Sequence, residues 1–125
     1  MKIKLDDIEL VECTPFTEVF DNKEFQTTTN FSIMYNGVKV GEIRTLVTSL
    51  NLKYIEYIEI YKQYQNNGIA TYLLAKYFKG YFISAGNTRV ISLYNRIGRD
   101  QTRFTDDECR VLAYNTGMYG TFIIE

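Results

Sequence analysis

The chain has 125 residues, no histidine, two cysteines and a formal net charge of -1 at pH 7. This composition excludes histidine-dependent catalytic triads and zinc sites, and it argues against binding to nucleic acid, which needs an excess of positive charge. The length suits a single domain, residues 1–125. The start lacks the apolar core of a signal peptide, and no apolar run reaches the roughly 18 residues of a membrane helix. We therefore expect a cytoplasmic protein with no membrane span and no metal.

The first part of the chain predicts a strand followed by a short helix. Residues 3–11 are typical of a strand. A helix is expected from Thr14, because Pro15 would occupy its first position, where the missing N–H costs nothing. The apolar residues of this predicted helix, spaced at i, i+3 and i+4, are Phe16, Val19 and Phe20.

Three strands in a row then predict an antiparallel meander. They cover residues 27–35, 38–46 and 53–62. Asn36-Gly37 separates the first two and is a strong hairpin signal, because both turn positions need positive φ. Ser49-Leu50-Asn51 provides the second turn.

After Gly68 the apolar residues recur at helical spacing, so a strand, a polar loop and a helix follow one another. The apolar positions are Ala70, Leu73, Leu74, Tyr77, Phe78 and Tyr81. The first N–H groups of a helix have no internal partner, and the helix dipole adds positive charge there. Gly68 and Ala70 would let an anion approach the backbone closely. This junction therefore predicts a pyrophosphate site, although it matches neither a P-loop nor a dinucleotide-binding fingerprint.

Two interpretations of the second half remain open. In the first, residues 81–84 form a strand and residues 87–97 a helix. In the second, the preceding helix is longer, residues 89–95 form a buried parallel strand, and a new helix starts at residues 105–108, which read as a capping box. The capping box and the element lengths favour the second interpretation. Gly80 argues against the second interpretation, because a glycine inside a helix lowers its stability by about 1 kcal/mol relative to alanine.

The loop Gln65-x-x-Gly68-x-Ala70 resembles the pyrophosphate loop, Gln/Arg-x-x-Gly-x-Gly/Ala, of the GNAT superfamily of acetyl-CoA-dependent N-acetyltransferases. The flanking residues that also agree with the family are Ile60, Tyr64, Leu73 and Leu74. The resemblance is specific over residues 53–81 and diffuse elsewhere. It implies an α+β fold with a GNAT-like mixed sheet, in which the meander is followed by the strand-loop-helix cofactor junction, a parallel strand, a helix and a C-terminal strand.

The resemblance also implies acetyl-CoA as co-substrate. Backbone amides from Asn66 to Thr71 would bind its pyrophosphate, and the strand around residues 58–61 would bond to its pantetheine arm. The residues thereby assigned to acetyl-CoA are Ile58, Ile60, Gln65, Asn66, Asn67, Gly68, Ile69, Ala70 and Thr71.

GNAT proteins use a tyrosine to protonate the departing CoA thiolate, and the two interpretations place it differently. The second gives Tyr114, our first candidate, in Tyr-x-x-Gly-Met. The first gives Tyr94, our second candidate, within a Leu-Tyr-x-Arg-x-Gly run that resembles a family motif. The resemblance places the base on the strand before the loop, which points to Glu56, provided that burial raises the pKa of its carboxyl. A β-bulge in this strand would change the direction in which Glu56 faces.

We therefore expect an N-acetyltransferase that moves acetyl from acetyl-CoA to a primary amine by direct attack in a ternary complex. The acceptor would be a small molecule or a protein, and carboxylates in its cleft would favour a cationic amine. Homodimers are common in the family. The alternative is a catalytically silent GNAT-fold binding module, including one encoded by a phage, that acts through protein contact. A third reading is an unrelated interaction domain in which residues 66–68 form only a turn.

Overall fold

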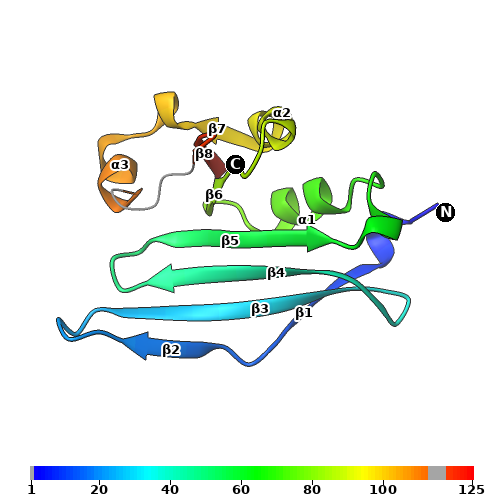
Figure 1. Cartoon of the computed structure of the whole chain (residues 1–125), viewed down its shortest axis with the longest axis horizontal. Helices are drawn as coiled ribbons and strands as arrows, with labels where there is room; N and C mark the ends of the chain where they lie inside the picture. Colours follow the sequence, from blue (N-terminus) through cyan, green and yellow to red (C-terminus); the bar gives the residue numbers. More distant parts are fainter. Residues whose placement is uncertain (1, 113–117) are drawn as a thin grey trace.

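The computed structural model describes residues 2–112 and 118–125. Their strands form one mixed sheet in the order β1-β3-β4-β5-β6-β8-β7, and β2 also pairs with β3 (Figure 1). The strands are β1 (Ile8–Glu12), β2 (Phe16–Val19), β3 (Phe25–Tyr35), β4 (Val38–Thr48), β5 (Lys53–Ile60), β6 (Phe82–Ser84), β7 (Gly98–Asp100) and β8 (Thr121–Ile124). The α-helices are α1 (Ile69–Tyr77), α2 (Arg89–Ile97) and α3 (Asp106–Leu112). Only the β5–β6 pair is parallel among the strand pairs of the described residues, and the fold class is α+β.

The predicted meander is confirmed as β3, β4 and β5, each antiparallel to the next. Asn36 and Gly37 form the first turn with φ of 49° and 79°, the positive values that the hairpin signal requires. Asn51, in the second turn, also has positive φ, at 65°. Local turn chemistry therefore sets the connections of this half of the sheet.

The predicted helix after Thr14 is wrong, because Phe16–Val19 is the edge strand β2, antiparallel to β3. Phe16 and Val19 are 50% and 72% exposed, so their helical spacing marks no buried face. A helix this short is unstable on its own, whereas β3 offers backbone partners to residues with high strand propensity. The hydroxyls of Thr17 and Thr27 add a cross-strand hydrogen bond of 2.9 Å. The strand expected at residues 3–11 begins only at Ile8, after a 3-10 turn, η1 (Leu5–Asp7).

In the second half, the first interpretation is correct for residues 81–97 and the favoured second one is wrong. The helix α1 ends at Tyr77, and Gly80 adopts φ of 87°, a left-handed conformation that no helix continues. The next residues form β6, parallel to β5, and α2 follows. The Asn87 side chain accepts the N–H groups of Arg89 and Val90 at 2.9 and 3.3 Å, which stabilises the start of a helix where a strand was expected.

The capping box is confirmed as the start of α3. The Thr105 N–H donates to Glu108 Oε1 at 2.7 Å, and the Glu108 N–H donates to Thr105 Oγ1 at 3.2 Å. The second interpretation was therefore right about this helix and wrong about what precedes it.

The sheet carries a hydrophobic core on each face. One core joins the meander to α1 and α2, and its most deeply buried members include Ile33, Ile43, Ile55, Leu73 and Leu74. The other joins α3 to the sheet through Leu52, Phe82, Leu112 and Ile123. In Figure 1, α2 and α3 accordingly lie on opposite sides of the short strands β6, β7 and β8.

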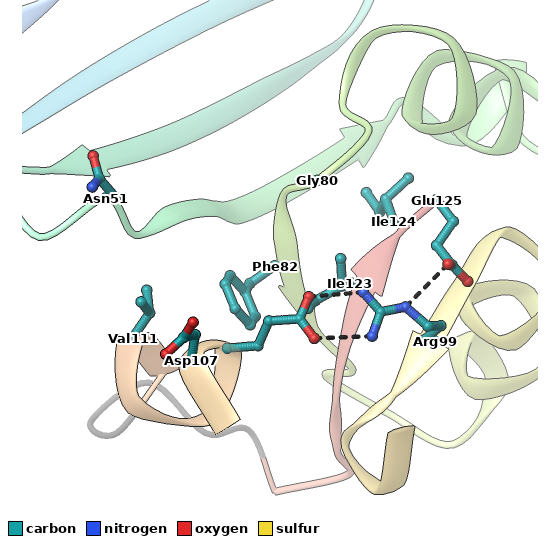
Figure 2. A pocket seen from close by; sticks show the side chains of 10 residues that line it. Asn51, Gly80, Phe82, Arg99, Asp107, Val111, Ile123, Ile124 and Glu125 are labelled. Carbon is teal, nitrogen blue, oxygen red and sulfur yellow. Dashed lines mark hydrogen bonds and ion pairs between the residues drawn. The ribbon is translucent and has the colours of Figure 1, made fainter. Parts of the chain in front are cut away.

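Arg99 of β7 links α3 to the end of β8 (Figure 2). Its two terminal nitrogens donate to the two carboxylate oxygens of Glu108 at 2.9 and 2.8 Å, and its Nε lies 3.0 Å from Glu125 Oε2. Both side chains of the Arg99–Glu108 pair are only about one quarter exposed, at 22% and 24%. The hydrogen bond from Arg99, aided by the Thr105 N–H, lowers the pKa of Glu108 to about 2.

We predict that this pair makes the fold sensitive to acid. Glu108 titrates near 4.5 in the unfolded chain and near 2 in the folded one, so its contribution is complete above about pH 4.5 and is lost as the pH falls toward 2. Glu108→Gln is expected to cost about 1–3 kcal/mol at pH 7 and to flatten the pH dependence of chemical denaturation over this range. Asp107→Asn is the matched control, because Asp107 and its partner Arg110 are 86% and 75% exposed. Equal losses in both variants would contradict the prediction.

Candidate functional site

A cleft of about 360 Å³ lies between β5, the start of α1 and α2. Its residues include Ile58 and Ile60 of β5, residues 65–71 of the loop and first helical turn, and Val90, Leu93 and Tyr94 of α2. The structure thus brings together every residue that the sequence assigned to acetyl-CoA. Tyr64 and Leu74, which flank the loop motif, also line this cleft.

The loop at one end of the cleft is held by its own amide side chains. Gln65 Nε2 donates to the Ile60 carbonyl at 2.8 Å, and Asn67 Nδ2 donates to the carbonyls of Tyr64 and Gln65 at 3.0 and 3.1 Å. Asn66 and Gly68 both have positive φ, at 65° and 75°. Left-handed residues in such a turn direct backbone N–H groups into a concavity, a geometry that suits an anion.

The first turn of α1 presents further N–H groups to the cleft. Gly68 is the residue before the helix, and no side chain of its own can cap these groups. The Tyr72 N–H donates to the Gly68 carbonyl at 3.0 Å, so the N–H groups of residues 69–71 precede the first internal bond of the helix. The helix dipole adds partial positive charge at this point. The loop and helix start together can hold a phosphate group without a charged side chain.

The side of the cleft is formed by a fork in the sheet. β5 and β6 pair only through Tyr54↔Phe82 and Ile55↔Ile83, and β5 continues to Ile60 without β6 beside it. Within the described residues, β5 therefore offers backbone groups without a strand partner along this edge, although the Ile60 carbonyl already accepts from Gln65. Such an edge can bond to an extended ligand that carries amides, as a neighbouring strand would.

A bulge in β5 explains where Glu56 lies. Arg44 of β4 pairs with Tyr57 and Thr45 pairs with Ile55, so Glu56 is an extra residue without a partner in β4. Its side chain is 44% exposed and lies 3.9 Å from the Arg44 guanidinium. The structure does not bring Glu56 into the cleft with Ile58 and Ile60, and the burial that a basic role would need is absent.

Of the two candidate acids, Tyr94 lines the cleft from α2. Its residue is 7% exposed, and its ring packs against Phe122 with centroids 5.6 Å apart. Burial, together with the neighbouring Tyr54, raises the pKa of Tyr94 to about 12. The phenol is therefore protonated at neutral pH, which is the form that a general acid must have. Tyr114 lies outside the described residues.

Val90 and Leu93 line the cleft beside Tyr94 but were not among the residues that the sequence assigned to the site. The first interpretation makes this segment a helix, in which positions 90, 93 and 94 share one face, so it indicates that Val90 and Leu93 lie beside Tyr94. This signal was missed because the second interpretation made this segment a strand.

Other kinds of site find little support. Within residues 2–112 and 118–125, no group of three or more His, Cys, Asp or Glu side chains could hold a metal ion. No helix in this described part of the chain is both long enough and apolar enough to span a membrane. No protein-family model, curated protein or solved structure matches the chain.

Proposed function

We propose that the protein is an N-acetyltransferase with a GNAT-like fold, which transfers acetyl from acetyl-CoA to a primary amine in a ternary complex. One observation carries the proposal: a single cleft unites the anion-binding type of loop, the open edge of β5 and a buried tyrosine. These three parts suit, in order, the pyrophosphate, the pantetheine amides and the leaving thiolate. The agreement of the loop with the GNAT pattern adds to this support.

Binding of acetyl-CoA would rest on the backbone. The N–H groups from Asn66 to Thr71 would donate to the pyrophosphate oxygens, favoured by the dipole of α1. The backbone of Ile58 and Ile60 would bond to the pantetheine amides, while Leu93 and the other apolar residues of the cleft would exclude water.

Tyr94 would act as the general acid. In the reaction, the nitrogen lone pair of the acceptor attacks the thioester carbonyl carbon, a C–N bond forms and the C–S bond breaks. Tyr94 donates its phenolic proton to the leaving sulfur and regains a proton from solvent. The proton released by the nitrogen passes to water, because no residue that lines the described cleft is Asp or Glu.

Release of free thiol from acetyl-CoA tests this function. The acceptors are an alkyl diamine, an amino sugar, an amino acid and a peptide with a free N-terminus. We expect amine-dependent thiol release with at least one class, and a rise in the thermal unfolding midpoint when CoA is added. A rise with CoA but no turnover on any amine would support the silent binding module. No rise and no turnover would contradict the proposal.

A further inference from the structure

Asn67 lines the cleft, and its side chain turns back onto the loop that precedes α1. Its Nδ2 donates to the Tyr64 carbonyl at 3.0 Å and to the Gln65 carbonyl at 3.1 Å. Because both partners are carbonyl oxygens, only the NH2 group of the amide can face them. The residue is partly buried. One side chain therefore fixes two peptide groups of the loop.

Asn67 and Gln65 together engage three carbonyl oxygens at the loop end of the cleft. The third belongs to Ile60, which accepts from Gln65 Nε2 at 2.8 Å. A carbonyl oxygen carries partial negative charge, so a carbonyl that turned into the cleft would repel a phosphate. Within the described part of the chain, the N–H groups of residues 66–71 form no hydrogen bond and stay available to an anion.

The bonds from Asn67 also hold an unusual backbone conformation. Asn66 and Gly68, on either side of it, have φ of 65° and 75°. The left-handed conformation costs energy for a residue other than glycine, so it persists where neighbouring contacts hold it. By tying position 67 to the carbonyls of Tyr64 and Gln65, the side chain keeps the loop in the turn that directs its N–H groups into the cleft.

The charge of the cleft makes this geometry important. Among the described residues that line it, none is Lys or Arg. Affinity for a phosphate then depends on backbone N–H groups and on the dipole of α1. Hydrogen bonds weaken steeply when their direction is lost, whereas a flexible lysine could follow a displaced phosphate. A change in the shape of the loop should therefore act directly on phosphate binding.

We propose that Asn67 is a positioning residue for the acyl donor, whose side-chain amide holds the loop in the shape that lets backbone N–H groups bind the pyrophosphate. This inference rests on the proposed acetyltransferase function. The hydrogen bonds of the amide are confined to the loop, so its effect is limited to the phosphate end of the donor. The thioester end, beside Tyr94, keeps its geometry.

The test is steady-state kinetics of Asn67→Leu with two donors: acetyl-CoA, and S-acetylpantetheine, which has the same thioester and amides but no phosphate. Leucine is close to asparagine in size and donates no hydrogen bond. We expect about a tenfold rise in the KM for acetyl-CoA, with kcat and the KM for the amine unchanged. The kcat/KM for S-acetylpantetheine should stay the same. Asn67→Gln, which keeps an NH2 group, should show a smaller rise in the KM for acetyl-CoA.

Gln63→Leu is the matched control, because Gln63 is an exposed residue of the same loop that does not line the cleft. It should leave the kinetics with both donors unchanged. An equal loss of kcat/KM with both donors in Asn67→Leu would show general damage to the cleft, and no change with either donor would show that the amide has no role. Either result would overturn the inference while leaving acetyl transfer intact. Absence of both CoA binding and thiol release in the unaltered protein would instead remove the proposed function, and this inference with it.

Discussion

Tyr94→Phe is expected to lower kcat for acetyl transfer by about 100-fold or more, with the affinity for CoA nearly unchanged. The variant keeps the ring that packs against Phe122 and removes only the proton that would reach the leaving thiolate. A general acid acts in the transition state, so its loss appears in kcat and leaves ground-state binding intact. Steady-state kinetics and calorimetric titration with CoA separate the two effects.

Tyr114→Phe is the informative comparison, because Tyr114 was the first candidate from the sequence and lies outside the described residues. Tyr77→Phe controls for the loss of a tyrosine hydroxyl, because Tyr77 is 46% exposed on α1 and does not line the cleft. If Tyr114→Phe loses activity while Tyr94→Phe keeps it, the assignment of the acid to α2 is wrong.

Ala70→Asp is expected to weaken CoA binding by about 100-fold or more without lowering the stability of the free protein. The added carboxylate would lie in the first turn of α1, where it satisfies unpaired N–H groups and interacts well with the helix dipole. The same position puts a negative charge against the pyrophosphate, and two like charges about 4 Å apart repel strongly even near a protein surface.

The matched control for Ala70→Asp is Gln63→Glu, which adds the same charge to an exposed residue of the loop that is not part of the cleft. Calorimetric titration gives the CoA affinity, and thermal unfolding gives the stability. Equal weakening in both variants would show a general charge effect and would count against the helix start as the anion site. Unchanged CoA binding in Ala70→Asp would contradict the assignment of an anion site to the start of α1.

Sequence reasoning succeeded where the signal was local. The Asn36-Gly37 turn requires positive φ at both positions, and the residues that tolerate this conformation are visible in the sequence. The capping box before α3 is equally local, since its two hydrogen bonds join residues three apart. The strand-loop-helix junction around Gly68 belongs to the same group.

It failed where distant residues decided the outcome. Phe16–Val19 is a strand because β3 lies beside it, and residues 82–84 form a strand because β5 and β8 flank them. Helical spacing over a short segment could not compete with these pairings. The position of Glu56 depends on the bulge opposite β4, which no period-two count along β5 reveals.

The most direct test of the central claim is an NMR titration of the backbone amides with CoA. We predict saturable shifts of the amides of residues 66–71 and of Ile58 and Ile60, because these line the cleft proposed to hold the pyrophosphate and pantetheine. Residues of β2, at the far edge of the sheet, should stay unchanged. If the amides of residues 66–71 do not shift at millimolar CoA, or if the shifts lie elsewhere, the account of this cleft is contradicted.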